Sequence, residues 1–171
     1  MDLAYFLFPA QNPIQFHALV FLLGSLSVSS LSDLRRMAAQ ADFAEVWGAF
    51  TAFMFLTDIY LGLTAQLGIA PFVIKWALIA LFVAVNSGSG IFSISTMDVT
   101  AVAALLATLN PTYIILTLPL MVLVNEFLKP LLSKYGEGGA YPFLPTVFAV
   151  NMLLLLVILA GGLEELLISS S

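Results

Sequence analysis

The sequence predicts an all-α membrane protein, with six transmembrane helices forming a single domain over residues 1–171. Three observations lead to this fold class. First, 61% of the 171 residues are hydrophobic and only 9% are charged, whereas soluble domains carry about 25% charged residues. Second, the mean hydropathy is +1.08. Third, apolar segments long enough to cross a bilayer follow one another through nearly the whole chain.

A membrane-spanning helix needs about 20 mostly apolar residues, and six segments are of roughly this kind. They cover residues 13–32, 43–66, 70–87, 95–109, 111–130 and 142–162. Helix starts are indicated by Pro71, by Asn110 as N-cap followed by Pro111, and by Pro142. Pro119 is expected to kink the fifth helix. The fourth segment is short, so it must begin below the membrane surface or lean on its neighbours.

The basic residues predict the orientation in the membrane. Arg35 and Arg36 lie between the first and second segments, and Lys129 and Lys134 lie between the fifth and sixth. With six alternating spans these two loops lie on the same side of the membrane, and only Lys75 lies towards the opposite side. Because basic residues gather on the cytoplasmic side, we expect a multi-pass protein of the cell membrane with both termini outside.

Several function classes are disfavoured by composition. The chain has no cysteine and one histidine, His17, which excludes disulfides and leaves no cluster of zinc ligands. Five basic residues do not make a nucleic-acid surface. We therefore expect no metal, no cofactor and no nucleic-acid partner. The lipid bilayer is the one certain environment, and the sequence leaves the oligomeric state open.

Two carboxylates, Asp33 and Asp98, are expected at the cytoplasmic membrane face. Acids within membrane segments are costly and suggest function, and two at one depth are the minimal equipment of an aspartic protease. Structural alternatives exist for both. Ser95 and Asp98 fit a capping box, while Asp33 could be a solvated partner of Arg36 or the N-cap of a helix beginning at Leu34. From helix dipoles alone, Asp98 would be the base and Asp33 the acid.

Three segments resemble the prepilin and preflagellin peptidases, a family of GxGD-type intramembrane aspartic proteases. SSLSDLRRM (29–37) resembles the first aspartate motif, in which a helix ends in Asp followed by basic residues. STMDVTAVAALLATLNP (95–111) resembles the second motif, GxGD followed by a helix of small residues. YPFLP (141–145) resembles the proline-bearing segment that opens a late helix near the active site of related proteases.

The resemblance covers the whole chain and is closest to the compact archaeal type. It implies an aspartic endopeptidase with Asp33 and Asp98 as catalytic residues and without a metal or cofactor. The implied substrates are pilin- or flagellin-like precursors, whose short basic leader would be cleaved from a hydrophobic helix at the cytoplasmic face.

Two alternatives remain from the sequence. The GxG of the family is here Ser95-Thr96-Met97, which favours a non-catalytic scaffold of the same fold. The other alternative is a small proton-coupled carrier that would use Asp58, Glu126 and Asp98. Such carriers often show internal repeats and broken helices, neither of which is evident. Glu126 is instead expected to pair with Lys129, three residues further along the same helix face.

Overall fold

The computed structural model describes residues 13–36, 41–64, 69–87, 95–136 and 141–169, and every long element in these ranges is a helix. The elements are α2 (Pro13–Arg36), α3 (Ala41–Leu63), α4 (Ile69–Asn86), α5 (Thr96–Ala107), α6 (Pro111–Leu132), the 3-10 helix η1 (Ser133–Tyr135) and α7 (Leu144–Ser169). The all-α prediction is confirmed for this part of the chain.

Five of these helices, α2, α3, α4, α6 and α7, are long and apolar enough to cross a membrane. The exception is α5, which has 12 residues and is therefore about 18 Å long, against about 30 Å of hydrocarbon in a bilayer. The fold is that of a helical membrane protein with five helices of spanning length and one shorter apolar helix. The short fourth segment of the sequence corresponds to α5.

The core of the protein is built around α5, which is in contact with α2, α3, α4 and α7. The residues from 101 to 110 are all buried. Four of the buried residues of α5 are alanines, and such small side chains let neighbouring helices approach closely. The helix that is too short to span is thus enclosed by its longer neighbours.

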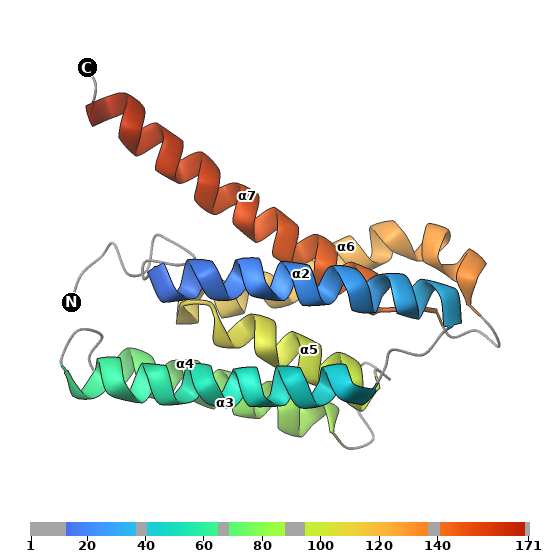
Figure 1. The fold of residues 1–171 in the computed structure, drawn as a ribbon, viewed down its shortest axis with the longest axis horizontal. Coiled ribbons are helices and arrows are strands. Elements are labelled where there is room, and N and C mark those ends of the chain that lie inside the picture. The colour runs from blue at the N-terminus through green and yellow to red at the C-terminus, as the bar shows by residue number, and fades with distance from the viewer. Residues whose placement is uncertain (1–12, 37–40, 65–68, 88–94, 137–140, 170–171) are drawn as a thin grey trace.

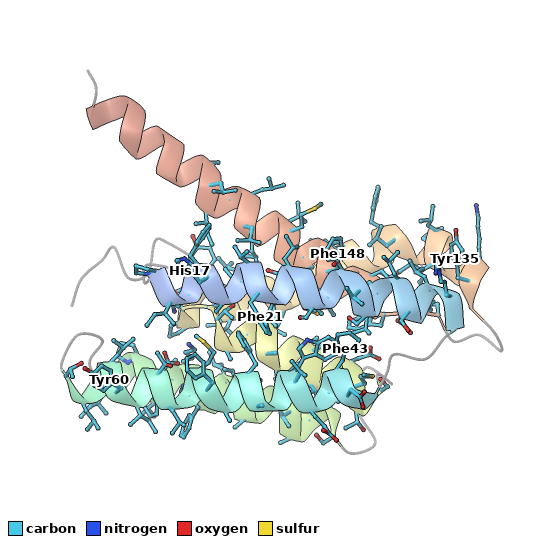
Figure 2. The ribbon with its side chains drawn as sticks, in the orientation of Figure 1. His17, Phe21, Phe43, Tyr60, Tyr135 and Phe148 are labelled. Atoms are coloured by element: carbon cyan, nitrogen blue, oxygen red, sulfur yellow. The ribbon has the colours of Figure 1, made fainter. Side chains whose placement is uncertain are left out.

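The helices run alternately up and down, so that particular termini meet at one end of the bundle (Figure 1). The end of α2 and the beginnings of α3 and α5 lie there. Figure 2 marks this end with Phe43 and Tyr135, and the opposite end with His17 and Tyr60. We call the first of these the Phe43 end of the bundle.

The surface of the bundle carries many large apolar side chains. Leu63 and Phe127 are each more than four-fifths exposed, and every one of the five long helices contributes further exposed apolar residues. An apolar surface of this extent is unfavourable in water and is what a lipid environment requires. The apolar surface and the length of the helices both indicate a membrane protein.

Several helix boundaries differ from those predicted. α2 continues to Arg36 rather than ending at residue 32, which places Asp33 inside the helix. α7 begins at Leu144 rather than at Pro142. α6 begins at Pro111 with Asn110 as its N-cap residue, as predicted, and it continues through Pro119. The side chain of Asn110 accepts a hydrogen bond from Gln15 of α2 (3.1 Å), so it joins two helices.

Candidate active site

Asp33 lies in the last turn of α2, and only 8% of its surface is exposed. Its Oδ2 accepts a hydrogen bond of 3.3 Å from the backbone N–H of Leu144, the first residue of α7. The first N–H groups of a helix have no partner within the helix, so this carboxylate satisfies one of them from another helix. Asp33 is therefore neither a solvated loop residue nor the N-cap of a helix at Leu34, because it is buried and within α2.

The start of α7 gives the Asp33 carboxylate an environment that the sequence did not indicate. The N-terminus of α7, the positive end of that helix dipole, lies beside the Asp33 carboxylate. The C-terminus of α2, the helix that carries Asp33, is a negative dipole end. The two dipoles act on the charge in opposite senses. The segment at 141–145 thus meets Asp33 at the N-terminus of α7.

Asp98 takes part in a complete capping box at the start of α5. The backbone N–H of Asp98 donates to Ser95 Oγ (3.2 Å), and Asp98 Oδ2 accepts from the Ser95 backbone N–H (3.1 Å) and from the Ser95 hydroxyl (2.8 Å). This confirms the capping role predicted from the Ser95-x-x-Asp98 pattern. A capping role does not exclude chemistry, because the second carboxylate oxygen, Oδ1, takes no part in these bonds.

The two aspartates interact electrostatically. Burial raises the pKa of the Asp98 carboxyl above its ordinary value, the hydrogen bonds from Ser95 lower it, and the charge of Asp33 raises it further. A like charge has this effect only when it lies close by in surroundings of low polarity. The fold thus brings both predicted site residues to the Phe43 end of the bundle and within electrostatic reach of each other.

A polar cluster formed by Asn125, Tyr141 and Thr146 joins α6 to the start of α7. The amide nitrogen of Asn125 donates to the Tyr141 hydroxyl (2.7 Å), and its amide oxygen accepts from the Thr146 hydroxyl (3.3 Å). The bonds hold the segment before α7 against α6. They thereby help to position the N-terminus of α7, whose Leu144 N–H contacts Asp33.

The predicted pair of Glu126 and Lys129 is confirmed, with Nζ of Lys129 3.7 Å from Oε1 of Glu126. Both side chains are at least half exposed. An ion pair of this length and exposure is weak, and Glu126 remains accessible at the surface of α6.

A cavity of about 410 Å³ lies between α4, α5, α6 and the segment that precedes α7. Its lining is mostly apolar and includes Glu126 and two members of the polar cluster. The lining residues are Phe82, Val102, Leu118, Pro119, Met121, Val122, Asn125, Glu126, Tyr141 and Phe143. The exposure of Pro119, Val122 and Glu126 shows that the cavity opens at the surface of α6.

Asp58 and Lys75 form a buried ion pair elsewhere in the bundle. Lys75 Nζ lies 2.7 Å from Asp58 Oδ2, and the side chains are 2% and 6% exposed, respectively. The indole N–H of Trp76 donates to the same oxygen (3.0 Å). We did not predict this pair, although Asp58 lies five residues before the end of α3 and Lys75 six residues after the start of α4. In an antiparallel hairpin that position places them side by side.

Within the described ranges, no three His, Asp or Glu side chains gather as metal ligands would. Comparison of the chain with known protein families, characterised proteins and solved structures gives no match. The arrangement of Asp33, Asp98 and their neighbours therefore has to be interpreted from its own chemistry.

Proposed function

We propose that the protein is a membrane aspartic endopeptidase in which Asp33 and Asp98 activate water. The observation that carries the proposal is the electrostatic interaction of the buried Asp33 carboxyl with the half-buried Asp98 carboxyl, which come from helices far apart in the sequence. Pairs of acids whose surroundings separate their proton affinities are the usual equipment for joint acid and base catalysis. The proposed substrates are pilin- or flagellin-like precursors with a short basic leader.

The contacts favour particular roles for the two acids. Asp98 Oδ1 lies outside the bonds of the capping box, and in our proposal this oxygen carries the proton that is given to the carbonyl oxygen. Asp33 accepts the Leu144 N–H at the positive end of α7, which suits the ionised base. This assignment is the reverse of the one expected from the dipoles of α2 and α5 alone. The two acids share their proton as a coupled pair.

The reaction follows from these roles. The Asp33 carboxylate removes a proton from water, and the water oxygen attacks the peptide carbonyl carbon. At the same time Asp98 gives its proton to the carbonyl oxygen. Asp33 then passes its proton to the leaving nitrogen as the C–N bond breaks, and the hydroxyl proton on the former carbonyl oxygen returns to Asp98. Water and the peptide bond are consumed, and both acids return to their starting states.

We place the proposed site at the cytoplasmic membrane face. Arg35 follows Asp33 closely. Lys129 is in the last turn of α6 and Lys134 directly precedes Tyr135, which Figure 2 places at the Phe43 end, so this end carries the basic residues expected on the cytoplasmic side. Lys75 does not weigh against this, because it is buried and paired with Asp58 and is not a charge of an external loop.

A second candidate is a non-catalytic membrane scaffold of the same helical arrangement. It is favoured by the structural work that both acids do, since Asp98 caps α5 and Asp33 binds the first N–H of α7. These contacts would explain the presence of both carboxylates in a protein that catalyses no reaction. The carrier alternative loses Asp58 as a free acid, because that residue is neutralised by Lys75.

A cleavage assay tests the proposal. The protein is co-expressed with a panel of pilin-like precursors as wild type, Asp33→Asn, Asp98→Asn and the control Asp42→Asn, which changes an exposed acid of α3. We expect wild type and the control to shorten a precursor, and the two site variants to lose at least about a hundredfold in rate. Equal cleavage by all four proteins would refute the dyad. Absence of cleavage by any of them would favour the scaffold.

A further inference from the structure

The hydrogen bonds of the polar cluster between α6 and α7 run in one direction, from Thr146 through Asn125 to Tyr141. The Thr146 hydroxyl donates to Asn125 Oδ1 (3.3 Å), and Asn125 Nδ2 donates to the hydroxyl oxygen of Tyr141 (2.7 Å). The Tyr141 oxygen is the acceptor in its bond, so the phenol proton is not used in the cluster. Among the described residues none accepts that proton, and a tyrosine hydroxyl can donate it.

Burial supports this direction of the bonds over the reverse one. In the reverse direction Tyr141 would donate to Asn125, Asn125 would donate to Thr146, and the Thr146 hydroxyl would hold the unused proton. Thr146 is fully buried, whereas Tyr141 is partly exposed. A buried hydroxyl needs a partner inside the protein, and Asn125 Oδ1 is the acceptor that Thr146 has among the described residues. The unused proton therefore belongs to Tyr141.

The side chain of Tyr141 lines the cavity of about 410 Å³ beside α6, which adjoins both aspartates. Tyr141 is three residues before Leu144, whose N–H binds Asp33, so the two backbones are at most about 11 Å apart. Val102, in the lining from α5, is four residues after Asp98, and residues four apart occupy the same face of a helix. The cavity thus places the Tyr141 hydroxyl in the neighbourhood of the carboxyl pair.

The surroundings of the hydroxyl make it a strong donor. Most of the cavity lining is apolar, with Phe82, Leu118 and Met121 among its residues, and a hydrogen bond is stronger in surroundings of low polarity. Successive bonds in a chain also polarise one another, so the bond that Tyr141 accepts from Asn125 strengthens the bond that its own O–H can give. A carbonyl oxygen inside the cavity would be a suitable acceptor.

We propose that Tyr141 is a further catalytic residue, whose hydroxyl donates a hydrogen bond to the oxygen of the peptide carbonyl under attack. The proposal rests on the endopeptidase function given above. A carbonyl oxygen has two lone pairs, so it can accept the Tyr141 O–H and the Asp98 proton together. Negative charge develops on this oxygen as water attacks, and a donor already in position stabilises it. Tyr141 keeps its proton throughout, so the balance of the reaction is unchanged.

The donor can be tested without cleavage, by placing a carbonyl group in the cavity. The chain contains no cysteine, so Val122→Cys puts a single thiol in the cavity lining, three residues from Asn125 and on the same side of α6. Bromoacetone alkylates this thiol with loss of bromide and leaves a methyl ketone on the sulfur. The same ketone on Val28→Cys, at an exposed position of α2 outside the lining, is the control.

The infrared C=O band of the ketone moves to lower wavenumber when its oxygen accepts a hydrogen bond. We expect Tyr141→Phe to return the band of the cavity ketone to higher wavenumber, and to leave the Val28 ketone unchanged. Asn125→Asp should act like Tyr141→Phe, because a carboxylate can only accept and would take the Tyr141 proton for itself. Tyr135→Phe, at an exposed tyrosine of η1, should have no effect.

Cleavage kinetics test the catalytic role of the donor in the protein without the added cysteine. Tyr141→Phe should lower kcat by about a hundredfold or more, the usual effect of losing one donor to a developing oxyanion. KM should change little, because the charge on the oxygen appears only in the transition state. Asn125→Asp should lower kcat in the same way, and Tyr135→Phe should not. Thermal unfolding in detergent shows that the compared proteins are folded.

The outcomes separate this inference from the endopeptidase proposal. An unchanged cavity ketone band in Tyr141→Phe would overturn the inference, and so would wild-type kcat in the same variant. A ketone band that reaches lower wavenumber only after Glu126→Gln would also overturn it, because Tyr141 would then donate to Glu126. The expected ketone bands without cleavage of any precursor would retain Tyr141 as a carbonyl donor and remove the endopeptidase proposal.

Discussion

The backbone N–H of Leu144 donates a hydrogen bond to Oδ2 of Asp33 (3.3 Å), which joins the first residue of α7 to the last turn of α2. The bond gives Asp33 a structural task in addition to its proposed chemical one. Variants can separate the two tasks, because they depend on different properties of the side chain.

Asp33→Asn should preserve the fold and abolish cleavage. Asparagine keeps an oxygen that accepts the Leu144 N–H but cannot act as a base. Asp33→Leu should also destabilise the protein by about 1–3 kcal/mol, since it leaves a buried N–H without a partner. Thermal unfolding in detergent, measured beside the cleavage assay, checks both. If Asp33→Asn unfolds as readily as Asp33→Leu, the hydrogen bond is not the source of the structural effect.

Ser95→Ala should destabilise the start of α5 by about 1 kcal/mol, the usual effect of losing an N-cap side chain. It should also raise the pKa of Asp98 further, because the hydrogen bonds from Ser95 lower it. Ser95→Thr is the matched control, since threonine also forms capping boxes. Thermal unfolding and an infrared titration of the carboxyl groups would measure the two effects. An unchanged Asp98 titration in Ser95→Ala would contradict the second.

The pKa of Asp98 predicts a pH dependence with a definite sign. Because burial and Asp33 raise this pKa in the folded state, the folded protein binds the proton more tightly than the unfolded chain. The contribution of Asp98 to stability is therefore greatest below the ordinary aspartate pKa, and it falls as the pH rises through the higher pKa of the folded state.

Asp33→Asn removes the like charge and should move the Asp98 titration to lower pH, whereas Asp42→Asn should leave it in place. Isotope-edited infrared spectroscopy of the carboxyl band would follow this titration directly. A shift to higher pH in Asp33→Asn would mean that the two carboxyls do not interact as like charges.

Asp58→Asn should destabilise the protein by about 3–5 kcal/mol, because it leaves the buried ammonium of Lys75 without a counter-charge. The double variant Asp58→Asn with Lys75→Met should recover most of this loss, since it removes both charges and keeps an acceptor for the Trp76 N–H. Glu126→Gln, which breaks an exposed pair, should change stability by less than about 1 kcal/mol.

Unfolding of the purified proteins in detergent by increasing denaturant would measure these differences. A double variant no more stable than Asp58→Asn would show that the pair does more than neutralise two charges. Retention of precursor cleavage by a folded double variant would separate this ion pair from the proposed active site.

The sequence by itself determined the properties that depend on residues close together in the chain. Hydropathy located the helices, the Asn110-Pro111 pair marked the start of α6, and the Ser95-x-x-Asp98 pattern gave the capping box, because these features involve residues within one or two turns. It also placed Asp33 and Asp98 at one end of the bundle, since alternating helices constrain the level of each residue.

Only the tertiary structure decided how the helices are rotated and which side chains meet. Rotation determined that Asp33 faces the first N–H of α7, that Lys75 meets Asp58 across a hairpin, and that α5 is enclosed by its neighbours. An almost uniformly apolar helix does not mark in its sequence which face will be buried, because lipid and protein interior are similarly apolar. Packing between the helices therefore settled what hydropathy left undetermined.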